Sequence, residues 1–208
     1  MKGCLKHFAV AVLLGAVTLM PVQADASAMH VPDDIYEWVQ SSSRINYYFN
    51  KREIHYDTDE SGKININVLK VPVLKTYDAI QIDDVLQKRR WREADVDGYG
   101  DLAGEADYLT INLKEKKVII EHVDLIDSQM WTMERTSPKS VFEIDKMSEK
   151  NKEAIFYKAI LAYEKKHGPE IAKQSKGELE HNDEKHLKKQ REEAEEAEKE
   201  SNTENNDQ

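Results

Sequence analysis

Cysteine is almost absent from this chain of 208 residues. The one cysteine, Cys4, precedes the long apolar run near the N-terminus, so no intrachain disulfide can form. A domain without disulfides must be stable through its own packed core, and a chain of this length can build one. The remaining sequence also has no thiol nucleophile and no zinc–thiolate site.

Positive charge is in deficit. Lys and Arg total 30 against 40 Asp and Glu, which gives a formal net charge of −10 and a pI of about 5.3. Binding to nucleic acid depends on a basic surface that neutralises phosphates, so the composition argues against a DNA or RNA partner.

Long apolar runs are limited to one, at the N-terminus. Two lysines precede the apolar stretch 8–20, which is too short to span a bilayer, and small residues follow at Ala26 and Ala28. We therefore predict that residues 1–28 are a secretory signal peptide, cleaved after Ala28 or Ala26. The mature chain is then expected to be secreted or periplasmic and to contain no transmembrane helix.

Catalytic motifs are lacking as well. The sequence contains no Gly-x-Ser-x-Gly, no His-Glu-x-x-His and no Gly-rich phosphate loop. His55 and His122 fall in predicted strands, where a structural role is favoured, and a pair such as Asp124 and Asp127 occurs in any acid-rich chain. The sequence favours a protein that is not an enzyme; it predicts no catalytic residue and no cofactor, and it identifies no binding residue.

Two acidic loops are candidates for a bound cation. Residues 57–65 place oxygen-bearing side chains and Gly62 as an EF-hand does, but Val68 replaces the glutamate that should close the loop. The segment 95–105 has three aspartates among glycines, followed by Glu105. The alternatives are a polar hairpin turn for the first loop and a hydrated surface loop for the second. No metal site is predicted.

Apolar alternation predicts an α+β, β-rich domain over residues 29–169. The change of apolar phase at Val68-Leu69 suggests a bulge, and Pro72 favours an edge position. Gly98, Gly100 and Gly104 predict a loop. Strands are expected at 45–49, 53–68 (as a hairpin), 108–113, 117–125, 130–135 and 141–144, with a short helix at 78–91.

The strongest helix signal covers residues 148–167. Ser148 is expected to cap this helix, and Gly168-Pro169 to end it. Its apolar stripe consists of Ile155, Phe156, Ala159, Ile160 and Tyr163. The predicted architecture is therefore an antiparallel sheet with one packed C-terminal helix.

Aromatic residues are absent from residues 170–208, where 13 acidic and seven basic residues leave a charge of −6. So charged a segment buries little apolar surface. We predict an acidic tail outside the domain, with a marginal solvated helix over 178–200 and disorder over 201–208.

Two features favour binding. Aromatic side chains crowd the start of the mature chain and would form a platform if exposed, or a core if buried; they are Tyr36, Trp38, Tyr47, Tyr48, Phe49 and Tyr56. The basic run 88–92, which includes Trp91, suits an acidic polymer or lipid headgroups, or the domain's own acidic residues.

The stretch Ser43 to Ile54, with the aromatic run Tyr47-Tyr48-Phe49 followed by Asn50, resembles the start of the bacterial surface-adhesin E-type domain. Alternation onward through Val71 and the strand pair at 108–119 are compatible with that family. The resemblance implies a small secreted β-rich module at a bacterial surface that binds host or envelope components, and it implies no catalytic residue.

Two functional hypotheses follow. The first is a non-catalytic, adhesin-like binding module that contacts an unidentified envelope or surface component. The second is an exported hydrolase that uses the carboxylates of residues 95–105 with a bound ion.

Overall fold

Eight antiparallel strands form one sheet within residues 29–206, the part of the chain that the computed structural model describes. The predicted α+β, β-rich class is confirmed, and the predicted signal peptide lies outside the described residues. The strands are β1 (Tyr36–Ser41), β2 (Ile45–Asn50), β3 (His55–Thr58), β4 (Ile64–Tyr77), β5 (Leu102–Asn112), β6 (Lys117–Asp127), β7 (Thr132–Thr136) and β8 (Ser140–Glu143). The α-helices are α1 (Ala79–Trp91), α2 (Lys152–Gln174) and α3 (His181–Asn206).

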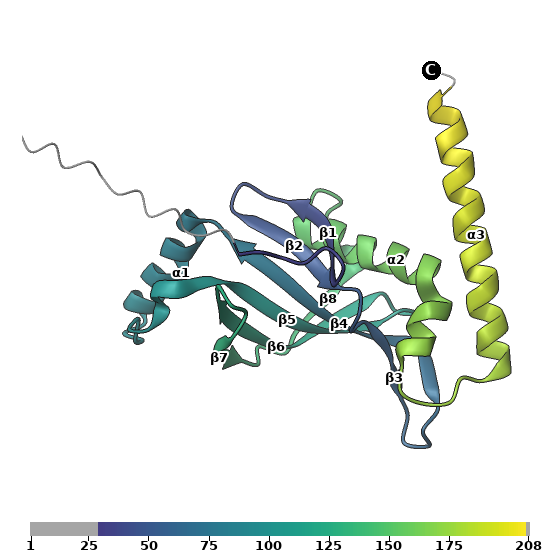
Figure 1. The fold of residues 1–208 in the computed structure, drawn as a ribbon, viewed down its shortest axis with the longest axis horizontal. Coiled ribbons are helices and arrows are strands. Elements are labelled where there is room, and N and C mark those ends of the chain that lie inside the picture. Colours follow the sequence, from purple (N-terminus) through teal and green to yellow (C-terminus); the bar gives the residue numbers. More distant parts are fainter. Residues whose placement is uncertain (1–28, 207–208) are drawn as a thin grey trace, which may run out of the picture.

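The sheet has the order β1-β2-β4-β5-β6-β7, and two strands lie off this path: β3 pairs with β4, and β8 pairs with β6. Figure 1 shows the strands running obliquely through the molecule, with α1 at one end and the C-terminal part of α2 with α3 at the other. Within the described residues, no helix is both long and apolar enough to cross a membrane.

Pro72 lies in the middle of β4, at a local gap in the pairing of one edge. Strand β3 pairs with β4 up to Lys70, and β2 pairs with it from Val73 onward. A proline has no N–H for the ladder, so this unpaired stretch is where the sheet tolerates it. The edge position predicted for Pro72 is thus confirmed locally, within a strand that is otherwise central.

A bulge accounts for the phase change that the sequence shows in β4. Tyr56 pairs with Leu69, whereas the next residue, Asp57, pairs with Asn65. Because of the extra residues of β4 between these partners, the buried positions change from the phase of Ile64 to the phase of Leu69 and Val71. This agrees with the bulge predicted from Val68-Leu69.

Two features of the sheet differ from the prediction. Strand β1 was not predicted, because its sequence YEWVQS shows no clean alternation. Gly104 was expected in a loop, but it lies in β5 opposite Thr76, where an added Cβ would be 2.2 Å from the Lys75 carbonyl oxygen. This glycine allows two backbones to approach closely.

The main core lies between one face of the sheet and α2. Alternate residues of the strands supply fully buried side chains, among them Phe49, Leu69 and Ile111, and α2 supplies Phe156 and Ile160. Tyr47 packs on Phe156 with ring centroids 5.4 Å apart. Burial of these large side chains is the main favourable contribution to folding.

Helix α2 differs from the predicted helix at both ends. It begins at Lys152, because Asn151 and not Ser148 accepts hydrogen bonds from the first free amides, those of Glu153 and Ala154. It continues through Gly168-Pro169 to Gln174. The boundary expected at residue 169 therefore falls inside α2. Figure 1 shows this helix changing direction in its C-terminal part, as a proline in a helix interior causes.

The predicted end of the helix at Gly168 was wrong because this glycine serves contact between helices. An added Cβ would lie 2.9 Å from a Leu187 side-chain carbon and 3.2 Å from the Tyr56 hydroxyl. The missing side chain thus lets α3 pack closely against α2 and β3.

Helix α3 is longer and better anchored than the marginal, solvated helix predicted over 178–200. Leu187 is 1% exposed and belongs to the main core. Gln190 donates to Glu164 Oε2 at 3.0 Å, and Lys166 pairs with Glu198 at 2.6 Å. Beyond these contacts, α3 projects from the rest of the molecule, and its backbone remains helical through 201–206, where disorder was predicted (Figure 1).

Candidate functional site

The first acidic loop, residues 57–65, forms a tight turn that uses the Asp59 carboxylate. Asp59 Oδ1 accepts hydrogen bonds from the hydroxyl and amide of Ser61 and from the amide of Lys63, at 2.7–2.9 Å. The Ser61 hydroxyl is the largest of the influences that lower the pKa of Asp59. Gly62 has a φ of 83°, which favours glycine. This geometry supports the hairpin-turn alternative.

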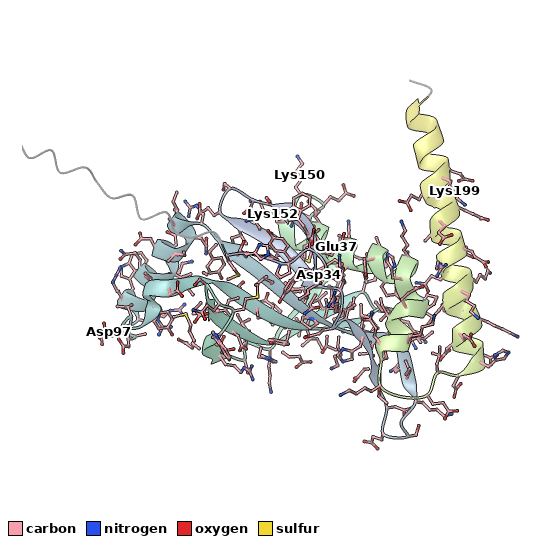
Figure 2. The ribbon with its side chains drawn as sticks, viewed as in Figure 1. Asp34, Glu37, Asp97, Lys150, Lys152 and Lys199 are labelled. Atoms are coloured by element: carbon pink, nitrogen blue, oxygen red, sulfur yellow. The ribbon has the colours of Figure 1, made fainter. Side chains whose placement is uncertain are left out.

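The carboxylates of the second acidic loop, residues 95–105, do not converge. Asp95 Oδ1 accepts from the Asp97 amide at 2.8 Å, and Asp101 Oδ2 accepts from the Ser128 hydroxyl at 2.7 Å. Figure 2 shows Asp97 at the outer tip of the α1 end. Within the described residues, no group of three or more His, Cys, Asp or Glu side chains is placed to hold a metal ion.

Asp124 and Asp127, the carboxylates considered as a pair in the sequence, have two separate structural roles. Arg135 donates to both Asp124 oxygens, at 2.6 and 2.7 Å, and this guanidinium is the main cause of the lowered pKa of Asp124. Asp127 Oδ1 accepts from the amides of Gln129 and Trp131 in the turn before β7. Neither carboxylate is placed to act with the other as an acid–base pair.

The aromatic residues near the start of the mature chain separate into two sets. Tyr47, Phe49 and Tyr56 are buried in the core, whereas Trp38 is 57% exposed. Tyr36 and Tyr48 are half-buried. A platform made of all six is therefore not present; the core interpretation holds for the first three.

A buried charged cluster lies between the sheet and α2, and sequence reasoning did not find it. Lys75 Nζ lies 2.8 Å from Asp107 Oδ2, 3.1 Å from Glu105 Oε1 and 3.6 Å from Glu153 Oε1. Asp107 is only 2% exposed, and its Oδ1 has no hydrogen-bond partner among the described residues. One lysine thus faces three carboxylates in a site shielded from water.

Burial sets the protonation of this cluster. It raises the pKa of Asp107 to about 6, although Lys75 acts in the opposite direction. Burial disfavours the charged form of Lys75, but the three carboxylates outweigh it and hold the pKa of Lys75 well above its usual range. The cluster joins α2 to β4 and β5 through a charged lysine and an aspartate whose pKa is raised by burial.

The opposite face of the sheet carries three flat rings side by side. Pro72 of β4 pairs with Tyr108 of β5, and Tyr108 pairs with His122 of β6. The Tyr108 and His122 rings are stacked, with centroids 4.0 Å apart and planes 17° apart. We call these three residues the ring row. Each is half-buried.

A polar row runs beside the ring row and crosses four strands. Lys70 Nζ lies 3.7 Å from Asp57 Oδ2 and donates to the Thr110 hydroxyl at 3.0 Å. The Thr110 hydroxyl donates in turn to Glu121 Oε1 at 2.8 Å. The polar row, Asp57, Lys70, Thr110 and Glu121, is therefore a connected set of donors and acceptors at the surface.

The two rows line a surface depression. A hollow of about 270 Å³ is lined by strand residues alone, including Tyr108, His122 and Thr110. A groove of about 610 Å³ adjoins it and is lined by the 52–58 segment and the end of α2. His55, Pro72 and Tyr108 line both, so the hollow and the groove form one continuous surface.

The basic run at the end of α1 is partly used within the domain. Arg89 pairs with Glu134, which also accepts from the Tyr99 hydroxyl, and the Arg89 guanidinium lies over the Tyr99 ring. Trp91 is 82% exposed, and Trp131, in the turn before β7, is 70% exposed. Neither tryptophan lines the hollow or the groove.

Comparisons of the chain with protein-family models, with curated proteins and with solved structures find no match. The resemblance to surface-adhesin E-type domains therefore rests only on the sequence features given above for residues 43–71 and 108–119.

Proposed function

We propose that this protein is an exported, non-catalytic binding module that contacts an envelope or surface component through the ring row and the polar row. The supporting observation is the continuous hollow and groove that Pro72, Tyr108 and His55 line together. Binding sites combine apolar surface with a few well-placed polar groups, and this face of the sheet supplies both.

The partners of the carboxylate and histidine side chains favour binding over catalysis. Asp124 is held by Arg135, and Asp59 by its own turn. His122 is stacked on Tyr108, and His55 Nδ1 is 2.7 Å from the Glu53 carbonyl oxygen. Each group has a structural partner in the arrangement described, so the rows offer contact surface rather than an activated nucleophile.

Export is the second part of the proposal, and it is supported by the sequence of residues 1–28, with their basic start, short apolar run and small residues at Ala26 and Ala28. Sequencing of the N-terminus of protein recovered outside the cytoplasm should begin at Met29 or Ser27. Recovery there of a chain that still begins at Met1 would contradict cleavage.

Binding is tested by co-sedimentation of purified residues 29–208 with envelope fragments of the producing cell. The unmodified chain should be retained, and Tyr108→Ala with His122→Ala should abolish most of the retention. Trp131→Ala is the matched control, because it removes an exposed aromatic side chain that lines neither the hollow nor the groove. No retention of the unmodified chain, or equal loss in the control, would contradict the proposal.

A further inference from the structure

We infer that two copies of this chain pair through opposite charges, with the C-terminal half of α3 of each copy lying against the solvent side of α2 of the other. This inference does not rest on the binding function proposed above. Its basis is that the solvent side of α2 is basic, that the C-terminal half of α3 is acidic, and that the shape of a single copy keeps these two surfaces apart.

The solvent side of α2 gathers lysines without acidic partners. Four lysines in or just before this helix are exposed and form no ion pair with another residue of the described range 29–206; they are Lys150, Lys152, Lys158 and Lys165. The acidic residues of α2 are used elsewhere: Glu153 belongs to the charged cluster, Glu164 is 4% exposed and Glu170 pairs with a residue of α3. Glu149, just before the helix, is exposed, so four lysines face one carboxylate and the surface stays basic.

An apolar side chain lies among these lysines. Ile155 is 43% exposed, although it was expected to belong to the buried stripe of this helix. Lys152 and Lys158 are each three residues from it and therefore flank it on the helix surface. Ala162, seven residues further on, is exposed on the same side. An apolar stripe between cations suits a helix that carries small side chains between carboxylates.

The C-terminal half of α3 has that composition. Residues 192–200 contain six acidic residues and one lysine, a charge of −5, and their apolar residues are Ala194 and Ala197. Glu192 and Glu196 are four residues apart, a spacing at which like charges destabilise a helix. Neither forms an ion pair with another described residue. A basic surface placed against this part of α3 therefore relieves a repulsion that a single copy leaves uncompensated.

The shape of a single copy keeps the two surfaces apart. Helix α3 meets α2 near the bend of α2, where Lys166 pairs with Glu198 at 2.6 Å, and its end then extends past the body (Figure 1). Figure 2 shows Lys150 and Lys152 at the start of α2 and Lys199 on the extended part of α3, on separate parts of the molecule. A second copy related by a twofold axis brings each α3 to the other copy's α2, so both contacts form together.

A second copy is favoured over an anionic membrane as the occupant of the α2 surface. An open groove of about 780 Å³ separates α3 from β1 and α2, so α3 stands as a wall beside this surface. A flat bilayer meets that wall and its carboxylates, whereas a helix can lie beside it. The ring row is on the opposite face of the sheet, so this pairing leaves it uncovered.

The test measures the oligomeric state of residues 29–208 by sedimentation velocity over a range of concentrations. The unmodified chain should form a dimer that dissociates on dilution. Lys152→Glu with Lys158→Glu should raise the dissociation constant at least about tenfold, because like charges then face each other. Glu192→Lys with Glu196→Lys should have the same effect. A mixture of these two variants should dimerise again, because each copy then offers the charge that the other needs.

The matched control is Lys88→Glu with Arg90→Glu, which changes the net charge equally at exposed positions of α1, at the other end of the molecule. It should dimerise as the unmodified chain does, and circular dichroism verifies that every variant is folded. The inference is overturned if the unmodified chain is a monomer at all concentrations or if the control weakens the dimer as much as the α2 variant does. It is also overturned if the mixture of folded variants stays monomeric.

Discussion

The two faces of the sheet are built from alternate residues of the same strands, yet they differ in composition and in use. Asp107 points to the α2 side and is 2% exposed, whereas Tyr108, the next residue, is half-buried on the other side. The α2 face holds the core and the charged cluster of Lys75. The other face holds rings and a polar row at the surface. Because successive residues of a strand point to opposite faces, the same strands supply the buried core on one face and the surface side chains on the other.

The largest effect is expected from a charge placed in the α2 face. Ile160 is fully buried beneath the sheet, and Ile160→Asp would bury a carboxylate that has no partner. This costs several kcal/mol, comparable with a whole domain stability of about 5–15 kcal/mol. The variant should show no cooperative thermal melt by circular dichroism. A melt within a few degrees of the unmodified protein would mean that α2 does not pack as described.

The next effect concerns α3, which extends the covered face. Leu187 is fully buried against Gly168, so Leu187→Ala should lower the free energy of unfolding by about 2–5 kcal/mol in urea denaturation. Removal of residues 176–208 should destabilise further, because Glu164 also loses its Gln190 donor.

The matched control for α3 is a chain that lacks only residues 201–208, whose stability should be unchanged. An unchanged midpoint after removal of all of 176–208 would show instead that the acidic tail is independent of the domain.

The contribution of the charged cluster to stability should depend on pH. The pKa of Asp107 is 3.8 ordinarily and about 6 in the folded protein, so between these values the folded chain binds more protons than the unfolded chain. The free energy of unfolding contributed by this group should therefore fall, by up to about 3 kcal/mol, as pH rises from below 4 to above 6.

The measurement compares Asp107→Asn with the unmodified chain in urea at several pH values. In the variant, the free energy of unfolding should lack the fall with rising pH that Asp107 causes. The unmodified protein should therefore lose any stability advantage over the variant as pH rises, and the variant can become the more stable of the two. Asp145→Asn, at an exposed aspartate paired with Lys116, is the control for loss of a carboxylate at the surface. Parallel curves for Asp107→Asn and the unmodified protein would contradict the shifted pKa.

The smallest effect on stability is expected on the other face. Tyr108→Ala removes a stacked ring that is half-exposed, and it should lower the free energy of unfolding by about 1 kcal/mol. Its effect on binding should be much larger. A stability loss as large as that of Leu187→Ala would show that the ring row is structural.

Sequence alternation predicted most strands of this fold, the α1 helix and the bulge near Val68-Leu69, because the apolar period follows directly from which side chains are buried. It failed at Gly168-Pro169, where two residues that usually end a helix lie inside α2. Their role depends on Leu187 and Tyr56, which are distant in sequence. The local helix-ending preferences of glycine and proline carry no information about contacts with residues that are distant in sequence.

The candidate site was not predictable for a similar reason. Pro72, Tyr108 and His122 lie in three strands and meet only through the register of the sheet. Alternation does show that Tyr108 points away from the face of Leu109, but not which residues lie beside it. The charged cluster was hidden because Lys75 and Asp107 lie outside the predicted strands 53–68 and 108–113, and only the pairing of β4 with β5 brings them together.

The position of Leu187 in the chain has a consequence for the order of folding. This residue completes a core whose other members lie between residues 47 and 172, and it is contributed by the last helix. Since a chain is made from its N-terminus, the sheet and α2 are complete before the side chain that covers Gly168 exists. A chain cut short before residue 187 would lack the side chain that packs against Gly168, so full packing of α2 requires synthesis to continue past residue 187.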